Sequence, residues 1–353
     1  MPEKSVLPVA MSGTTRRRRP PLAWVGNGFL IVVAVLAGWV LVSNLVKNPI
    51  EFLQNVLDGL KLGCVYALIA LGYTMVYGIV KLINFAHGDV FMVGAFVSFS
   101  VITSLGFNGP IRDPVTLVVV LLVAFAITMP LMGILGVSIE RFAYRPLRNA
   151  PRLAPLITAI GVSFILQNVI QILYGPSPKS FPQIFPFSAR FTLFGASIPW
   201  ITVFIFLVTV GLTIALSLFV GKSRMGRAMR STAQDREAAQ LMGVNINTTI
   251  ALTFFLGSAL AGAAGLVYGL NYGTIAFGMG FGAGLKAFTA AVLGGIGNLA
   301  GAVVGGFMIG FIEVITAQLG YSRWAEAVVF SVLIIVLVFR PSGLFGQQLG
   351  ERA

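Results

Sequence analysis

Residues 221–247 read GKSRMGRAMRSTAQDREAAQLMGVNIN, the longest polar interruption among the long apolar runs of this chain. Five basic residues lie in this stretch, namely Lys222, Arg224, Arg227, Arg230 and Arg236. A loop rich in arginine and lysine between two membrane spans stays on the cytoplasmic side of the membrane. The stretch therefore predicts a polar cytoplasmic segment held at both ends by membrane-spanning helices.

The same stretch carries the start and stop signals of a short helix. Ser231 or Thr232 can cap its start, with Gln234 or Asp235 three residues later. Gly243 can end it, because glycine adopts the left-handed conformation at little cost. A short amphipathic helix held outside the bilayer by two spans predicts a docking element for a soluble cytoplasmic protein.

The composition of the whole chain is that of a membrane protein. Hydrophobic residues make up 57% of the 353 residues and charged residues only 10%, whereas soluble domains carry about 25% charged residues. The apolar runs are continuous over about twenty residues, as transmembrane helices require, while barrel strands alternate over about ten. The 41 glycines allow helices to approach one another closely in a membrane. We therefore expect an all-α fold, a polytopic transmembrane helical bundle.

The apolar runs and the basic residues between them predict the topology. We expect spans at about 24–46, 52–80, 90–105, 115–139, 153–173, 200–220, 248–270, 300–319 and 324–339, and a shorter apolar segment within 283–296. Arginine and lysine concentrate before the first span, between the fourth and the fifth, and in 221–247, which places these parts inside. This bias requires both termini to be cytoplasmic, with about ten spans if 283–296 crosses. If that segment instead re-enters and returns, Arg340 falls on the outer side.

Four parts follow from this topology. Residues 1–23 form a basic cytoplasmic tail, 24–46 an extra N-terminal transmembrane anchor, 51–346 the main transmembrane domain, and 347–353 a second cytoplasmic tail. The first tail is long for a signal peptide, and no convincing A-x-A site follows the apolar run, so we expect the anchor to be retained. The proline-rich stretch 175–199 cannot be one helix, and we expect a structured outer loop there.

Catalytic and metal-binding motifs are missing from the sequence. The chain has one histidine, His87, and one cysteine, Cys64, which excludes a histidine-rich metal site and an internal disulfide. Residues 221–223 read GKS, like the end of a phosphate-binding loop, but Leu216 stands where that loop needs its first glycine. We therefore expect no catalytic site, no metal, no cofactor and no ATP binding by the chain itself. The net charge of +13 follows from the topology and does not indicate a nucleic acid partner.

The stretch NFAHGD, residues 84–89, is the first candidate for a translocation path. Broken helices that line a cavity expose backbone and polar groups to a substrate, which would give this role to Asn84, His87 and Asp89. The alternative is a tight turn between two helices, in which Asn84 and Asp89 cap the helices and Gly88 turns the chain. The sequence leaves both interpretations open.

Four ionisable residues lie in or near apolar runs, namely Asp58, Lys61, Lys286 and Glu313. Such residues are functional candidates by default. Asp58 and Lys61 are three residues apart and are expected to pair on one helix face. Lys286 and Glu313 could serve the path of a zwitterionic substrate, or could only pair with each other and hold helices together. The expected path set is Asn84, His87, Asp89 and Lys286.

Several long blocks resemble a known family. They are GLKLGCVYALIALGYTMVYGIVKLINFAHGDVFMVGAF (59–96), GRAMRSTAQDREAAQLMGVN (226–245), GLKAFTAAVLGGIGNLAGAVVGG (284–306) and VLVFRPSGLFG (336–346). In this order they resemble the permease subunits of bacterial branched-chain amino acid ABC importers, and among these the H-type permease. The resemblance covers about residues 50–346, so that the N-terminal extension, residues 1–50, departs from the usual family pattern.

This resemblance implies which residues of 221–247 dock. Glu237-Ala238-Ala239-x3-Gly243 is similar to the EAA-type motif of ABC importer permeases. In that family the helix of the motif fits a groove on the ATPase subunit, which agrees with the docking element expected from charge and capping. With Arg230 added, the expected ATPase-docking set is Arg230, Glu237, Ala238, Ala239 and Gly243.

The family also implies the rest of an assembly. We expect a second, homologous permease subunit, two cytoplasmic ATP-binding subunits and an extracytoplasmic substrate-binding protein. The chain would lie as a multi-pass protein among the lipids of the bacterial inner membrane. It would import branched-chain, hydrophobic amino acids by alternating access, with urea or short amides as the alternative within the family. An ion-coupled secondary transporter is the alternative of another class, for which only Glu313 is a plausible acidic group.

Overall fold

The computed structural model describes residues 38–39, 42–148, 150–151, 153–186 and 190–346. The predicted tails, 1–23 and 347–353, and most of the predicted anchor at 24–46 lie outside the described residues. Contacts divide the chain into two units, residues 1–49 and 50–353. In the first unit, the described residues 42–47 are helical.

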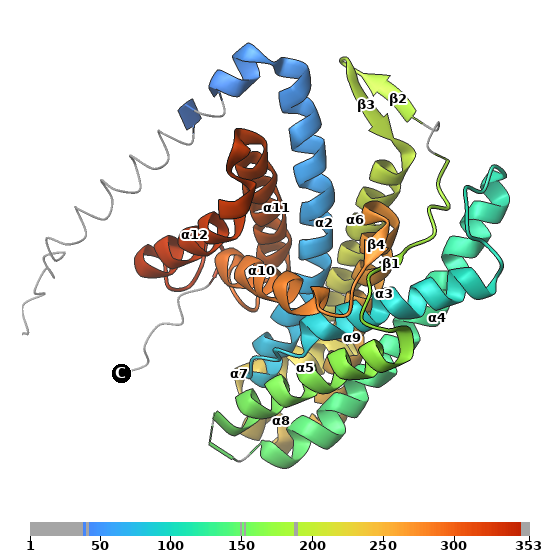
Figure 1. Ribbon diagram of the computed structural model, residues 1–353. Coiled ribbons are helices and arrows are strands. Elements are labelled where there is room, and N and C mark those ends of the chain that lie inside the picture. Colours follow the sequence, from blue (N-terminus) through green and yellow to red (C-terminus); the bar gives the residue numbers. More distant parts are fainter. Residues whose placement is uncertain (1–37, 40–41, 149, 152, 187–189, 347–353) are drawn as a thin grey trace, which may run out of the picture. The chain divides into compact units, whose positions relative to one another are not determined.

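Helices make up almost all of the described part of the second unit (Figure 1). In chain order they are α2 (Pro49–Val80), α3 (His87–Ser104), α4 (Pro114–Ile139), α5 (Leu153–Tyr174), α6 (Trp200–Lys222), α7 (Arg224–Gln234), α8 (Arg236–Leu241), α9 (Ile246–Tyr272), α10 (Met279–Gly294), α11 (Leu299–Thr316) and α12 (Ala325–Phe339). Short antiparallel pairs join β1 (Lys179–Ser180) to β4 (Thr274–Ile275) and β2 (Arg190–Leu193) to β3 (Ala196–Pro199). The all-α class is confirmed. The described residues of the proline-rich stretch 175–199 form short strands, turns and irregular backbone and no helix, in agreement with the expectation from its prolines.

Seven helical stretches of the described residues are long and apolar enough to span a membrane. One of them, 299–339, runs through both α11 and α12 and is broken at Gly320, whose φ of 86° is not helical. The shorter α10, which overlaps the predicted segment 283–296, is also apolar. These helices support a membrane bundle, while the number of about ten spans and the cytoplasmic position of both ends stay predictions.

The core of the second unit is built where helices meet through small residues. Of the seven stretches, α2 is the most buried. It packs on α11, with Gly63 against the backbone of Phe307, while α3 packs on α9, with Gly94 against Gly262. Close approach of this kind lets dispersion forces and backbone contacts hold helices together in a membrane, where no hydrophobic effect draws them together. The large glycine content of the chain is therefore explained by helix packing.

Replacing Gly94 by alanine is expected to destabilise the bundle, since a Cβ atom at this position would lie 2.6 Å from the Cα of Gly262. Real Cβ atoms do not approach this closely, so α3 and α9 must move apart at a cost of about 1–3 kcal/mol. Gly161→Ala in α5 is the control, because no atom lies within 4 Å of the added carbon and alanine gains about 0.5–1 kcal/mol in a helix. Thermal unfolding in detergent measures both. An unchanged or higher Tm for Gly94→Ala would contradict this packing.

Two helices begin inside the bundle, and the first of them, α3, starts at His87, three residues before the predicted span at about 90–105. The chain turns at Lys81, whose φ of 59° is left-handed, and returns along α2. The ring of His87 then lies against Gly72, because a Cβ on Gly72 would be 2.3 Å from its Nε2. Gly72 precedes the end of α2 by about 12 Å of helix. His87 and Asp89 thus lie in the first turn of α3, and both are buried.

The second of these helices is α10, whose start meets the start of α3. A Cβ on Gly88 would lie 2.3 Å from the carbonyl oxygen of Gly280, so the two backbones touch. Gly284, one helical turn later, also lies against Gly88. Helices that begin within a membrane domain are tolerated where their ends are covered by protein or line a cavity. The meeting point of α3 and α10 is such a place.

Candidate functional site

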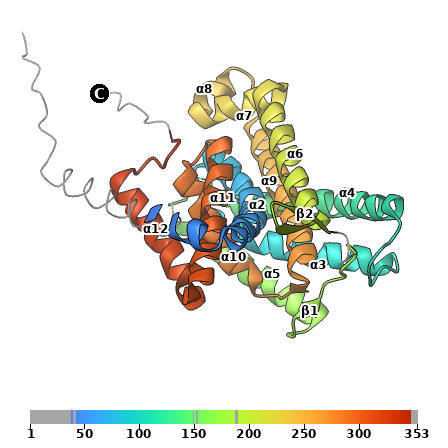
Figure 2. The same cartoon turned by 90° about the horizontal axis from the view of Figure 1, so that it is seen from above.

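The polar segment 221–247 contains two helices rather than the one that was expected. Ser223 caps α7 by accepting from the N–H of Gly226 at 2.8 Å, and Asp235 caps α8 by accepting from Ala238 at 3.0 Å. Asp235 itself is extended, with φ −150° and ψ 116°, which breaks the helical path between α7 and α8. The prediction that Ser231 or Thr232 caps the helix was therefore wrong, since both residues lie within α7. α7 and α8 lie together next to α6 and α9 (Figures 1 and 2).

Gly243 ends α8 as the sequence predicted. Its φ is 83°, and its N–H donates to the carbonyl of Gln240 at 3.0 Å, while the N–H of Val244 donates to Ala239 at 3.0 Å. This pair of hydrogen bonds is the Schellman arrangement, which satisfies carbonyls that a helix end leaves open. With Asp235 at its start and Gly243 past its end, α8 is a short helix closed at both ends.

The predicted docking residues are placed unequally on this helix. Glu237 and Ala238 are exposed, whereas Ala239 is buried and holds α8 to the rest of the chain. Two residues outside the predicted set are the most exposed apolar side chains of α8 and its cap, Leu241 at 88% and Met242 at 85%. These two adjacent apolar side chains in a polar segment are candidates for contact with another protein.

Two arginines of this segment donate hydrogen bonds to carbonyls at helix ends. Arg230, a member of the predicted docking set, donates to the carbonyls of Val220 and Gly221 in the last turn of α6. Arg236 donates to the carbonyls of Ile79, at 3.4 Å, and Val80 at the end of α2. The last four carbonyls of a helix have no partner within it and carry its negative dipole end, so an arginine stabilises both positions.

The role of Arg236 could not be found from spacing along the chain. Its carbonyl partners lie more than 150 residues earlier, at the end of a different span. Burial, and then the nearby Arg148, lower the pKa of the Arg236 guanidinium, although arginine stays charged in proteins. The only signal in the sequence was a basic residue at the start of a helix, where the helix dipole does not favour positive charge.

A buried carboxylate organises the loop after α4. Glu140 is fully buried and opens a π-helical turn, Glu140–Tyr144. It accepts hydrogen bonds from Arg145, at 3.0 Å, and from Arg148. Arg148 also donates to Oδ1 of Asn247 at 2.6 Å, which ties this loop to the start of α9. An acidic residue inside a run of arginines was the signal that sequence reasoning missed.

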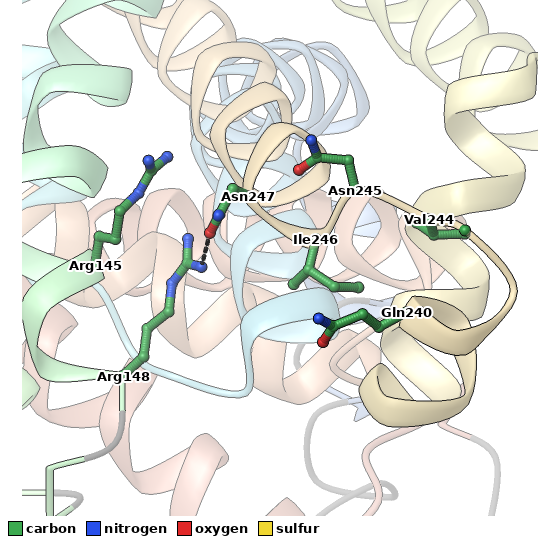
Figure 3. A pocket seen from close by; sticks show the side chains of 8 residues that line it. Arg145, Arg148, Gln240, Val244, Asn245, Ile246 and Asn247 are labelled. Atoms are coloured by element: carbon green, nitrogen blue, oxygen red, sulfur yellow. Dashed lines mark hydrogen bonds between the residues drawn. The ribbon is translucent and has the colours of Figure 1, made fainter.

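These groups face α8 across a pocket of about 660 Å³. Figure 3 shows Arg145 and Arg148 reaching from one wall, and Gln240, Val244 and Asn245 standing on the other. The dashed line in Figure 3 is the bond between Arg148 and Asn247. The pocket therefore separates the loop after α4 from the end of α8, while the Arg148–Asn247 bond joins that loop to the start of α9.

The structure brings together three of the four predicted path residues. Asn84, His87 and Asp89 are all buried around the start of α3. Asp89 accepts hydrogen bonds from Ser163 and, at 3.0 Å, from Gln167, both on α5. Neither ring nitrogen of His87 has a hydrogen-bond partner of good geometry among the described residues. A carboxylate in the first turn of α3 stabilises the positive end of the helix dipole. Their path role stays a prediction.

Lys286 lies with a different set of side chains. Its Nζ is 2.7 Å from Glu313 and 3.2 Å from Glu326, and the hydroxyl of Tyr66 donates to Glu313 at 2.8 Å. This cluster connects α10, α11, α12 and α2, so the structure contains the Lys286–Glu313 pair, which was one of the two alternatives that the sequence left open. Pairing does not exclude contact with a substrate, and the path role of Lys286 also stays a prediction. The expected pair of Asp58 with Lys61 is present at 2.6 Å.

Comparison with known proteins finds similarity to branched-chain amino acid permeases over most of the chain. A family model described as "Branched-chain amino acid transport system / permease component" matches residues 55–338. The high-affinity branched-chain amino acid transport system permease protein BraD of Pseudomonas aeruginosa is 46% identical over 305 residues, which cover 86% of this chain and 98% of BraD. The permease protein LivH of the corresponding system of Escherichia coli strain K12 is 44% identical over 306 residues, covering 85% of this chain and 97% of LivH.

A more distant relative extends the same group. The probable branched-chain amino acid transport permease protein LivH of Methanocaldococcus jannaschii is 27% identical over 287 residues, covering 79% of this chain and 88% of that protein. No solved structure matches the chain.

Proposed function

This chain belongs to the permease family of branched-chain amino acid transport systems, and from that membership we propose that it imports leucine, isoleucine and valine as the membrane subunit of an ABC importer. The chain makes and breaks no covalent bond in this proposal. ATP-binding subunits in the cytoplasm supply the energy, a second permease completes the path, and a binding protein outside delivers the amino acid. The relatives named above do not favour urea, short amides or ion-coupled transport.

The single observation that carries this proposal is the form of α8. A short helix closed by Asp235 and Gly243 lies between two membrane-spanning helices and exposes Leu241 and Met242. Such a helix can enter a groove on a cytoplasmic ATPase and be moved by it as one body. We propose that Glu237, Ala238 and Gly243 belong to this contact, while Ala239 and Arg230 hold the helices that present it.

For the path we propose the place where α3 and α10 begin. An amino acid carries one charge of each sign. The positive ends of two helix dipoles suit its carboxylate, and Asp89 suits its ammonium group. Because Asn84, His87 and Asp89 are buried, a path here requires α3 and α10 to separate, which alternating access between two states provides. Lys286 would lie farther along α10 on the same route.

The topology that goes with this function has about ten spans, both ends in the cytoplasm and a bacterial inner membrane around them. Arg16–Arg19 and the basic residues of 141–152 and 221–247 would then share one side with α8. Residues 24–46 would add one crossing outside the segment that the family model matches. The proposal gives this extra crossing an anchoring role only.

Reconstitution tests the function directly. The chain, its partner permease and the ATP-binding subunits would be placed in proteoliposomes with the binding protein and labelled leucine. We expect uptake that requires ATP, that isoleucine and valine compete for, and that an ionophore leaves unchanged. Uptake that persists without ATP and collapses with the ion gradient would replace this proposal by ion-coupled transport, and competition by urea alone would replace the substrate.

A further inference from the structure

Segment 79–84, which comprises the last two residues of α2 and the first four residues of the connection to α3, is held by side chains from two other elements. Arg236 of α8 bonds to the carbonyls of Ile79 and Val80. Tyr144, at the end of the π-helical turn, donates to the carbonyl of Ile83 at 3.3 Å and to Oδ1 of Asn84 at 3.1 Å. Both ends of segment 79–84 are thus held by side chains that are distant in the sequence, Arg236 at one end and Tyr144 at the other.

The first of these contacts connects α8 directly to α2. Arg236 is the first residue of α8, directly after the capping Asp235. Its guanidinium supplies donors to carbonyls that α2 itself cannot satisfy, and charged donors make stronger hydrogen bonds than neutral ones. α8 is short and closed at both ends, so any displacement of α8 pulls on the end of α2 through this side chain.

The second contact starts at the other end of α8. Gly243 leads within four residues to Asn247, which accepts a hydrogen bond from Arg148. Arg148 and Arg145 both bond to Glu140, which opens the same π-helical turn that ends in Tyr144. The hydroxyl of Tyr144 is therefore the last member of a chain of hydrogen bonds and backbone that begins at α8 and ends at Asn84.

Segment 79–84 in turn positions the start of α3. The N–H of His87 donates to the carbonyl of Asn84 at 3.1 Å, so the first residue of α3 is bonded to this segment. One residue later, the backbone of Gly88 touches Gly280 of α10. Packed backbones leave no room for a movement of one partner alone. A shift of 79–84 must therefore change how α3 and α10 meet.

We infer that Arg236 and Tyr144 are positioning residues, which pass a movement of α8 to segment 79–84 and from there to the meeting point of α3 and α10. This inference rests on the proposed function, in which an ATPase moves α8. It names the physical connection between the docking helix and the buried polar residues of α3. Neither residue touches a substrate in this account, and neither forms the docking surface.

Tyr144→Phe is the sharpest test, since it removes one hydroxyl and leaves the ring packed beside Phe254, 5.4 Å between centroids. We expect normal co-purification with the ATP-binding subunits and retained ATP hydrolysis. The amount of amino acid imported per ATP hydrolysed should fall about fivefold, because the free energy of one buried hydrogen bond corresponds to a factor of about this size. The control is Tyr174→Phe, which removes a hydroxyl bonded to Ser100 at 2.6 Å, away from this connection. Tyr174→Phe should keep the ratio of the unchanged protein.

Arg236→Gln tests the same inference by weakening the contact of α8 with the carbonyls of Ile79 and Val80. This test does not depend on how well Tyr144→Phe folds. Its control is Arg227→Gln, on α7, whose exposed side chain bonds only weakly to the carbonyl of Lys222 at 3.4 Å. We expect a lower import ratio for Arg236→Gln and an unchanged one for Arg227→Gln. A normal ratio in Tyr144→Phe and Arg236→Gln, or an equal loss in the controls, would overturn the connection. Uptake by the unchanged protein without ATP would instead overturn the proposed function, and that is seen before any variant is made.

Discussion

Changing Leu241 and Met242 together to aspartate is expected to abolish both co-purification with the ATP-binding subunit and ATP-dependent uptake. Both side chains are almost fully exposed in this chain, and burying an apolar side chain of this size is worth about 1.5–3 kcal/mol. Losing both contributions weakens binding by at least about a hundredfold, and two carboxylates in an apolar groove oppose it further. The measurement is the amount of ATPase retained on tagged permease, together with uptake in vesicles.

The matched control for this change is Phe194→Asp. Phe194 is 85% exposed on the turn between β2 and β3, so this change also replaces a highly exposed apolar side chain by aspartate but lies outside α7 and α8. We expect normal retention of the ATPase for Phe194→Asp. Normal retention and uptake for the doubly substituted α8, or an equal loss in the control, would rule out the docking surface assigned here.

Glu140→Ala is expected to destabilise the folded protein by about 3 kcal/mol, because breaking a buried ion pair leaves its partners without compensation. Glu140 is fully buried, and Arg145 and Arg148 keep only part of their side chains in contact with solvent. The value lies at the low end of the range for buried pairs, about 3–5 kcal/mol, since solvent still reaches both arginines. Unfolding by heat or denaturant in detergent measures the change.

Asp58→Ala provides the comparison for Glu140→Ala. The pair of Asp58 with Lys61 is partly exposed on one helix, and exposed pairs contribute about 0–1 kcal/mol. The decrease in the free energy of unfolding should therefore be several times smaller for Asp58→Ala than for Glu140→Ala. If the two variants lost the same stability, Glu140 would not be the anchor of the loop after α4.

Much of the helical content could be predicted from local sequence, because a membrane span depends only on the length and polarity of one apolar run. The starts of α4, α5, α6 and α9 lie within two residues of the predicted ones for this reason. The left-handed turn at Gly243 was predictable for the same reason, since it depends on one residue and its neighbours. A local rule also explains the break between α7 and α8, but Asp235, which was expected three residues after the cap, is itself the cap of α8.

The contacts that shape the candidate site were not predictable in this way. Arg236 with Val80 and Tyr144 with Asn84 join residues far apart in the sequence. Which residues become partners depends on which helices are neighbours in the fold, and the hydrophobic periodicity of the sequence carries no information about that. The return of the chain after Lys81 was hidden because a buried turn and an exposed loop use the same polar residues. For Lys286, the sequence could state two alternatives, and only the arrangement of α10 and α11 showed the pair.

The central claim is that α7 and α8 face the cytoplasm and that an ATP-binding subunit covers α8. Met242→Cys tests it, because the natural cysteine, Cys64, is buried and leaves little background for a membrane-impermeant maleimide. We expect the maleimide to label the introduced cysteine in inside-out vesicles but not in intact cells whose outer membrane has been made permeable. Binding of the ATP-binding subunit should reduce the labelling in the inside-out vesicles. Labelling from the outer face, or labelling inside that the bound subunit does not reduce, would contradict the account.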